Sequence, residues 1–338
     1  MVATLRRSGQ ALLDLLELAE NLIRVGQRVI AEFEPVVMLA AASHHRAIRK
    51  RLAGRRAAGR ADRRPVVPRL GPPVVVNYKG GIAVTKFNFN GWGNKQIHGN
   101  DGQIAERVAQ RLGLPVFNTG LVGEAGWVET DGHGTLIAHE SSFVNPNRNK
   151  GGKAEVERLL MDTMGAQKII WAPGIKGADI TDYHIDALAR FVKPGQIVIQ
   201  MGEEIDRRDP WSVAAFQTPD ILAAATDPQG RKMQLVVLPE PEEPRIKTDD
   251  FVSSFVNYYV CNGAVIAAEF GDEDADEEAE EILHTLYPGR EVVMLKFDPV
   301  GEVGGGIHSL KSQPARAVAN ARHKSCHALA FSGSARSR

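Results

Sequence analysis

One pattern limits how this chain can fold: a helix-like segment, a turn signal and a short apolar run follow one another repeatedly. The five copies are ALLDLLELAENLIRVGQRVIAEF before PVVML, QIAERVAQRLGL before PVFN, AEVERLLMDTMGAQ before KIIWAP, PDILAAATDPQGRKM before QLVVLP, and DEEAEEILHTLYPGRE before VVMLKF. Further strand-like runs lie between the copies, namely GIAVTKFNFN, GTLIAHESSFV, QIVIQM and NGAVIAAEF. We therefore predict an α/β protein built from five ββαβ-like repeats.

Such repeats can be arranged in two ways. Five α/β units can close into a ring, with strands around a central axis and helices outside, so that loops from several units converge on one axial site. An ordinary open α/β sheet is the alternative, which the alternation of helices and strands also permits.

Composition excludes several kinds of partner. Of the residues, 43% are hydrophobic and 24% are charged, and 41 basic side chains balance 41 acidic ones. Balanced charge argues against a nucleic-acid or membrane-surface role, so the expected partner is a small molecule. Cys261 and Cys326 form neither a disulfide framework nor a metal-ligand spacing. The apolar stretch 11–42 is interrupted by charges and is not a membrane span, so a cytoplasmic location is predicted.

Two stretches do not carry the repeat. Residues 43–72 are dense in Arg and Ala, and residues 315–338 have a similar composition. The second stretch is expected to be a disordered tail. The first contains no aromatic residues between its basic ones, which argues against a nucleic-acid patch. We treat residues 1–314 as a single domain.

The segment ITDYHIDALARF holds the first candidate for chemistry. His184 lies two residues after Asp182 and two before Asp186, and in an extended chain this spacing places the three side chains on one face. A carboxylate beside a histidine orients the ring for general acid/base work. A structural or surface histidine is the alternative, and no third ligand supports a metal site.

Two further segments hold single candidates. GEAGWVETDGHGTL places Glu124 among glycines, where a ligand can approach, although an exposed acid beside a hairpin turn is the alternative. Trp92 in FNFNGWGNK could line a pocket or fill the core. The cluster around Pro146 in NPNRN is assigned to a local turn network.

In the stretch GEVGGGIHSL, a glycine run is followed closely by a histidine and a serine. Gly304–Gly306 lack side chains, so the backbone there can come very close to another group. The question is what Ser309 does directly after it.

Taken together, these stretches resemble the agmatine deiminase and bacterial peptidyl-arginine deiminase family. The similarity rests on FNFNGWGNK, GEAGW with DGHGT, NPNRN, TDYHIDALARF, SFVNYYVCNGAVI and GGGIH, in this order over residues 74–314. It implies a five-bladed α/β propeller of the pentein type. It also implies hydrolysis of an agmatine or arginine guanidinium to a ureido group with release of ammonia, linked to putrescine formation. No metal or other cofactor is implied, and a homodimer is expected.

The resemblance also implies roles for individual residues. His184 is the general acid/base, Asp186 and Glu124 grip the guanidinium, and the glycine run lies against the substrate. The implied site residues are His184, Asp186 and Ser309 as the catalytic set, with Glu124, Gly305, Gly306, His308 and Trp92 binding the substrate. Ser309 stands where the family has its nucleophilic cysteine, so this chain is expected to be impaired. The alternative is a catalytically inactive guanidinium-binding homologue.

A second departure lies before the first VVV strand. The family has a tryptophan, an Arg-Asp pair and Gly-Pro there, the aspartate being a substrate ligand, whereas here only Gly71-Pro72 is present. One permissible GC-rich coding of ADRRPVVPRLGP, read one base later, gives PTDDLWCRDSG, which contains the expected motif. We therefore predict that residues from about 43 to 70 are translated out of frame, and the same hypothesis extends to the tail.

Overall fold

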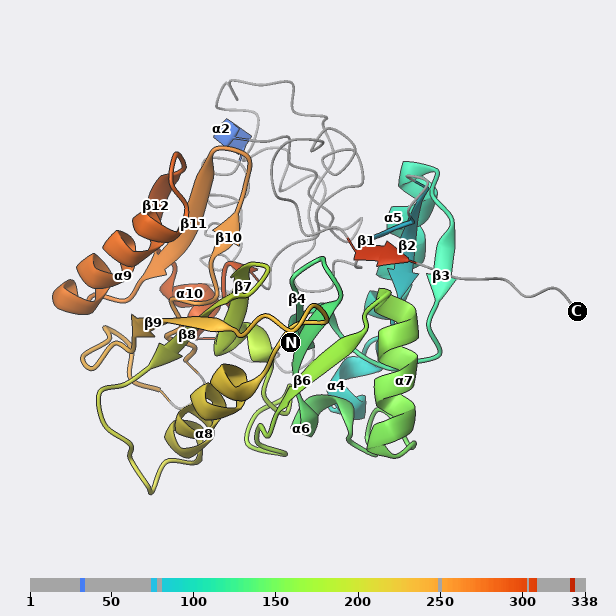
Figure 1. Cartoon of the computed structure of the whole chain (residues 1–338), viewed down its shortest axis with the longest axis horizontal. Coiled ribbons are helices and arrows are strands. Elements are labelled where there is room, and N and C mark those ends of the chain that lie inside the picture. The colour runs from blue at the N-terminus through green and yellow to red at the C-terminus, as the bar shows by residue number, and fades with distance from the viewer. Residues whose placement is uncertain are drawn as a thin grey trace, which may run out of the picture. The chain divides into compact units, whose positions relative to one another are not determined.

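Figure 1 shows the computed structural model of the chain, which describes residues 31–33, 74–77, 81–248, 251–302, 304–308 and 329–331. The chain divides into two compact units. Leu70–Leu238 with Ser312–Arg338 is called the central unit, and Met1–Arg69 with Pro239–Lys311 is called the terminal unit. The single domain over residues 1–314 stays a prediction.

The central unit contains three sheets. Its elements are β1 (Val74–Asn77), β2 (Ile82–Lys86), α4 (Gly91–Asn94), η3 (Asp101–Gln103), α5 (Ile104–Leu112), β3 (Val116–Asn118), η4 (Ala125–Trp127), β4 (Val128–Thr130), β5 (Thr135–His139), α6 (Glu140–Phe143), α7 (Lys153–Met164), β6 (Lys168–Ala172), η5 (Ile185–Ala187), β7 (Ala189–Lys193), β8 (Gln196–Met201), α8 (Pro210–Ala224), β9 (Gln234–Pro239) and β13 (Leu329–Phe331). The strand orders are β13-β1-β2-β3, β4-β5-β6 and β7-β8-β9. Strand β9 ends at Pro239, the first residue beyond the central unit.

The terminal unit contains one sheet. Its elements are α2 (Ala31–Phe33), β10 (Tyr259–Val260), β11 (Ala264–Glu269), α9 (Glu273–Leu286), β12 (Glu291–Lys296) and α10 (Asp298–Gly301). The strand order is β10-β11-β12.

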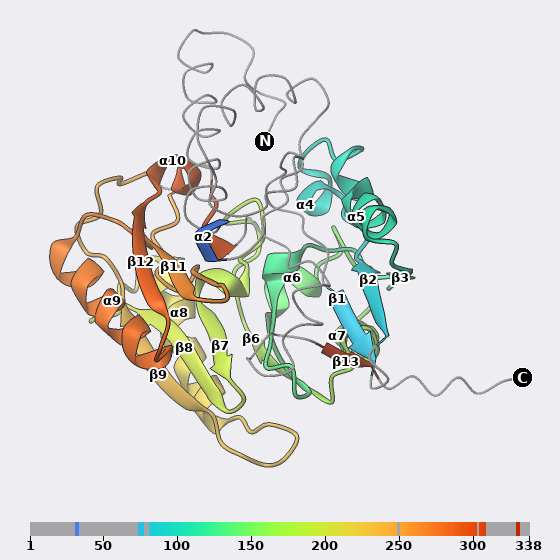
Figure 2. The ribbon, with the colours of Figure 1, turned by 90° about the horizontal axis from the view of Figure 1, so that it is seen from above.

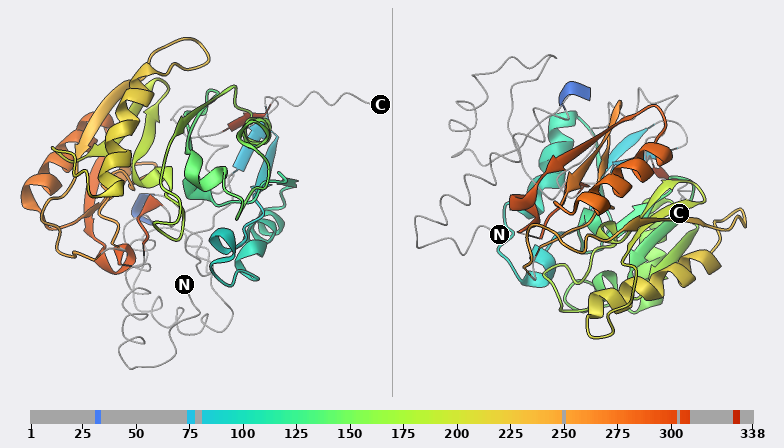
Figure 3. Two further views of the ribbon diagram at one scale, coloured as in Figure 1. Left: turned by 90° about the horizontal axis from the view of Figure 1, so that it is seen from below. Right: turned by 90° about the vertical axis from the view of Figure 1, so that its left-hand side faces the viewer.

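The sheets repeat one connection. Two antiparallel strands are followed by a helix and then by a strand beside the second one, as in β4, β5, α7 and β6. The third strand is parallel to the second in the sheets that contain β3, β6 and β12. Figure 2 shows α5 beside β2 and β3, and Figure 3 shows α8 along β8. Four ββαβ repeats are therefore visible, as predicted, whereas the copy at residues 11–39 lies outside the described residues except for α2.

The helix ends follow the local sequence. Asp272 caps α9 by accepting from the Ala275 amide, and helix α7 ends at Gly165, which has a φ of 63° that suits glycine. The predicted helix start at Pro219 is wrong. Helix α8 begins at Pro210, because Asp209 caps its first turn by accepting from two backbone amides.

The central unit buries two apolar clusters. One surrounds Trp127 and Phe143, whose rings stack with centroids 3.5 Å apart, and the other contains Phe191 and the neighbouring strand residues Ile197 and Ile199. These clusters anchor β4, β5 and β7, and the segments that lead into β4 and β7 carry candidate site residues. No helix in the described part of the chain is both long and apolar enough to cross a membrane.

We expect Gly123→Ala to destabilise the protein by about 1–3 kcal/mol, because an added methyl group overpacks a filled core. A Cβ atom at Gly123 would lie 1.3 Å from the buried Trp127 ring. Gly99→Ala is the control, since no atom lies within 4 Å of a Cβ built there. Urea unfolding at neutral pH measures both variants, and equal stabilities would contradict the packing at Gly123.

Candidate active site

His184 and Asp186 lie on a tight turn rather than on an extended chain. His184 is the residue before the 3₁₀ turn η5, which contains Asp186. The predicted convergence of Asp182 with these two residues is wrong, because the Asp182 carboxylate binds Lys95 and Arg148 instead. The spacing of two residues places side chains on one face only in a strand, and no strand forms here.

Gly126 lies against both remaining candidates. A Cβ atom at Gly126 would be 2.8 Å from Nδ1 of His184 and 2.9 Å from Oδ2 of Asp186. The missing side chain therefore allows the GEAGW loop to approach the imidazole and the carboxylate together.

Glu124 lies on the other side of the same imidazole. Its Oε1 is 3.7 Å from Nε2 of His184. Glu124 is only 3% exposed, so the alternative of an exposed acid beside a hairpin is wrong, although the hairpin between β4 and β5 forms as predicted. Nε2 is buried and has no hydrogen-bond partner among the described residues, which leaves it available to a reacting group.

Arg148 is the residue whose part in this site the sequence did not indicate. Its Nε and Nη2 donate to Oε1 of Glu124 at 2.9 and 2.7 Å, and its Nη1 donates to Oδ2 of Asp182 at 2.6 Å. Burial alone would lower the pKa of Arg148, but the charge of Glu124 and the hydrogen bonds that Arg148 donates to both carboxylates raise it above its ordinary value. The turn predicted for NPNRN is present, since Oδ1 of Asn145 accepts from the Asn147 amide. Its arginine, however, joins two buried acids.

His139 is a second buried histidine close to the site. It ends β5, is fully buried, and its Nδ1 lies 3.0 Å from the carbonyl oxygen of Tyr183. Burial lowers the pKa of His139 to about 4, so its ring is neutral at pH 7. The sequence GTLIAHE did not indicate that His139 lies buried close to the site, because a single histidine at a strand end is common.

The glycine run belongs to the terminal unit and is held by Asn257. A Cβ atom at Gly306 would lie 2.1 Å from Oδ1 of Asn257, so the close approach predicted for the run is made to this side chain. The His308 amide donates to the carbonyl oxygen and to Oδ1 of Asn257, at 3.0 and 2.9 Å. Gly305 is buried. Ser309 lies outside the described residues, and contact of Gly305, Gly306 and His308 with substrate stays a prediction.

Trp92 and Cys261 are both buried. Trp92 packs edge-on against Phe89 with ring centroids 5.0 Å apart, which matches the core-filling alternative, and its contact with substrate stays a prediction. Cys261 is a buried thiol that donates to the carbonyl oxygen of Ala264. It therefore behaves as a packed core residue. Among the described residues, no group of His, Cys, Asp or Glu is arranged to hold a metal ion.

Comparison of the sequence with known proteins shows the family to which the chain belongs. The model of the Porphyromonas-type peptidyl-arginine deiminase family matches residues 8–314. The agmatine deiminase of Pseudomonas fluorescens is 31% identical over 313 residues, which cover 85% of this chain and 84% of that protein.

Solved structures show the same fold. The agmatine deiminase of Enterococcus faecalis has a TM-score of 0.76 at 23% identity, covering 89% of this chain and 87% of that one. A cysteine-to-serine variant of the C. jejuni agmatine deiminase has a TM-score of 0.73 at 22% identity, covering 88% of this chain and 86% of that one. The chain thus has the α/β pentein fold, as predicted. It belongs to the Porphyromonas-type peptidyl-arginine deiminase family, which includes agmatine deiminases and whose members are hydrolases acting on amidine C–N bonds.

We expect Arg148→Met to destabilise the protein by about 3–5 kcal/mol, because it leaves Glu124 buried without the guanidinium that binds it and leaves Asp182 with Lys95 as its one ion-pair partner among the described residues. Arg158→Met is the control, since the Arg158–Asp162 pair is exposed and worth at most about 1 kcal/mol. Urea unfolding of both variants makes the comparison. Equal losses of unfolding free energy in the two variants would show that the Arg148 cluster carries no such penalty.

His139 should make stability depend on pH. Its pKa is about 4 in the fold and about 6.5 in the unfolded chain, so the unfolded state takes up a proton first as the pH falls. This contribution to stability is complete above pH 6.5 and is lost between pH 6.5 and 4. Between pH 7 and 5 the native chain should therefore lose about 2 kcal/mol more unfolding free energy than His139→Asn. Exposed His133→Asn controls for the loss of a histidine, and an unchanged pH dependence in His139→Asn would contradict the prediction.

Proposed function

We propose that this chain binds the guanidinium group of agmatine and hydrolyses it to a ureido group with release of ammonia, at a rate limited by Ser309. The observation that carries the proposal is that His184 lies between two carboxylates, with Asp186 beside it against Gly126 and Glu124 at its Nε2. A guanidinium is planar and offers several N–H donors, so two fixed carboxylates can bind it in one orientation.

The three side chains have distinct tasks in this proposal. Asp186 and Glu124 accept hydrogen bonds from the substrate, and Oε2 of Glu124 has room for this because its one contact with Arg148 is 3.3 Å long. His184 transfers protons at Nε2: it takes up the proton that the attacking nucleophile loses, passes it to the guanidinium nitrogen that leaves as ammonia, and then removes a proton from the attacking water. Glu124 also lies beside the imidazole, with its Oε1 3.7 Å from Nε2.

Ser309 determines the rate. The family's chemistry requires a nucleophile that attacks the central guanidinium carbon, expels ammonia and forms a covalent intermediate that water then releases. A thiol forms its anion near neutral pH in a cationic site, whereas a serine hydroxyl titrates far higher. The proposal therefore places the impairment in the covalent step and leaves binding intact.

A second candidate function is guanidinium binding without turnover. Its support is the C. jejuni agmatine deiminase, in which a cysteine-to-serine variant was crystallised with substrate bound. A serine is thus compatible with a filled site in a relative of this fold. The homodimer and the cytoplasmic location stay predictions.

We expect Ser309→Cys to raise ammonia release from agmatine on the order of 100-fold, because it restores an ionisable nucleophile. The measurement compares the native chain with Ser309→Cys, and Ser309→Cys/His184→Gln is the control that removes the proton carrier. Calorimetry with agmatine, free arginine and an N-acylated arginine amide identifies the ligand. Agmatine binding without turnover in either chain would support the second candidate, and absence of binding to all three ligands would overturn both.

A further inference from the structure

The loop that leads into His184 contains two strained residues. Asp182 and Tyr183 have φ angles of 60° and 72°, in the left-handed region that L side chains rarely adopt. In the described part of the chain, the other non-glycine residues with positive φ are Trp92 and Asn94, both in α4. Because such conformations cost free energy, surrounding contacts must hold them.

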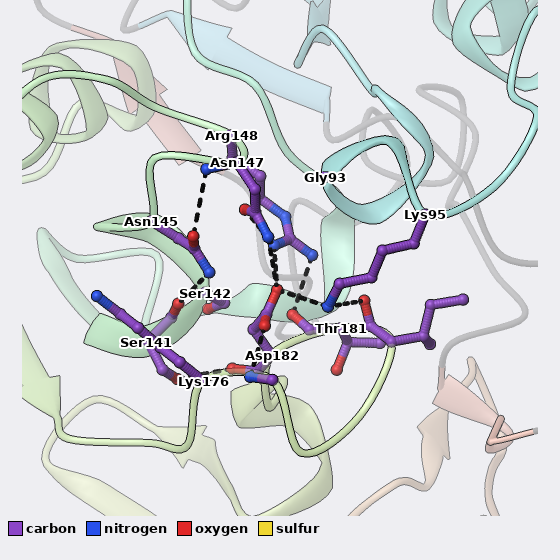
Figure 4. A network of polar contacts seen from close by, with 12 residues as sticks. Gly93, Lys95, Ser141, Ser142, Asn145, Asn147, Arg148, Lys176, Thr181 and Asp182 are labelled. Atoms are coloured by element: carbon purple, nitrogen blue, oxygen red, sulfur yellow. Dashed lines mark hydrogen bonds and ion pairs between the residues drawn. The ribbon is translucent and has the colours of Figure 1, made fainter.

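The Asp182 carboxylate receives four such contacts (Figure 4). Oδ2 accepts from Arg148 Nη1 at 2.6 Å, from Lys95 Nζ at 3.0 Å and from Asn147 Nδ2 at 3.3 Å. Oδ1 accepts from the Gly177 amide at 2.8 Å. Burial alone would raise the pKa of Asp182, but the hydrogen bonds, that of Arg148 first, hold it below its ordinary value. The carboxylate is therefore a fully bonded anion.

The backbone of the two strained residues is held as well. The carbonyl oxygen of Asp182 accepts from Ser141 Oγ at 2.6 Å, and that of Tyr183 lies 3.0 Å from His139 Nδ1. The Tyr183 ring packs between His139 and Trp211, with centroid distances of 4.2 and 4.6 Å. Side-chain and backbone contacts thus fix the peptide that leads directly into His184.

Lys95 ties a second strained segment to this loop. It follows α4, in which Gly91–Asn94 all have positive φ, and its Nζ donates to the carbonyl oxygens of Asp179 and Ile180 as well as to Asp182. The four strained non-glycine residues of the described chain therefore lie in or next to two segments that Lys95 joins.

Arg148 links this arrangement to the reacting groups. One guanidinium binds Asp182 through Nη1 and Glu124 through Nε and Nη2, and Glu124 faces His184. The loop before His184 and the acid beside it are consequently held by one rigid, planar group.

We propose that Asp182 is a positioning residue, which holds the strained Asp182–Tyr183 pair and thereby fixes the His184 ring relative to Glu124. This inference rests on the proposed function, in which His184 carries the protons. A purely structural role would stabilise the fold without affecting the His184 ring.

Asp227 provides a matched control. It is also a buried aspartate, its Oδ1 accepts from the amides of Gln229 and Arg231, and its Oδ2 accepts from the Arg231 side chain. Asp182→Asn and Asp227→Asn each remove one buried negative charge with little change in shape. Only the first removes it from the His184 loop.

The first readout is independent of turnover. In the full chain with ¹³C-labelled histidine, the Cε1–Hε1 signal of His184 is assigned by its loss in His184→Gln. We expect this signal to move or broaden in Asp182→Asn and to be unchanged in Asp227→Asn. A native-like signal in Asp182→Asn, or equal changes in both variants, would overturn the proposal. This result holds even if the proposed function fails, because no substrate is needed.

The second readout uses turnover in the Ser309→Cys background. Asp182→Asn should lower kcat about 100-fold with KM changed less than about threefold, because a displaced proton carrier affects the reaction step more than binding. Asp227→Asn should leave both constants unchanged. Equal kcat in the two variants would overturn the proposal. If Asp182→Asn does not fold, Lys95→Met is measured instead. Lys95 is one-third exposed, and its loss leaves three contacts to Asp182 in place. A changed His184 signal in Lys95→Met would support the positioning role, and an unchanged signal would overturn it.

Discussion

The pairing of one buried guanidinium with two buried carboxylates determines the architecture of the candidate site. Removing Glu124 and Asp182 from water is unfavourable unless each receives charged hydrogen bonds, and Arg148 supplies them to both. Because the guanidinium is planar and its N–H groups have fixed directions, both carboxylates must take defined positions around it. The GEAGW loop, the NPNRN turn and the His184 loop are therefore mutually dependent.

The ββαβ repeats hold these three loops in fixed positions. Glu124 directly precedes η4 and β4, Arg148 lies on the turn after α6, and His184 directly precedes η5 and β7. Strand β4 contacts both β7 and η5, while packed apolar side chains such as Trp127 fix the strand ends. Interiors of this density resist small displacements, so three loops from different parts of the sequence keep the geometry of one site.

The repeats could be predicted from sequence because each depends on local periodicity. The strands β8 and β9 form over the predicted residues, whereas the start of α8 was missed because Asp209 caps it ahead of Pro219. In the site, His184, Asp186 and Glu124 were named from their motifs, and the structure brings them together, while their roles stay predictions. The contact between Arg148 and Asp182 was not predicted, because a long-range ion pair leaves no periodic pattern in the sequence. The left-handed backbone before His184 also differs from the extended geometry that the spacing argument assumed.

The same buried charges explain why a chain can keep these site residues without keeping the activity. Removing one member of the Arg148 cluster costs about 3–5 kcal/mol, which is comparable to the whole stability of many domains. Glu124, Arg148 and Asp182 are thus required by the fold whether or not any substrate is hydrolysed. A serine in place of the family's cysteine at position 309 removes no member of this charged cluster. The presence of these buried residues therefore does not by itself indicate turnover, which in the proposed function is decided at the nucleophile.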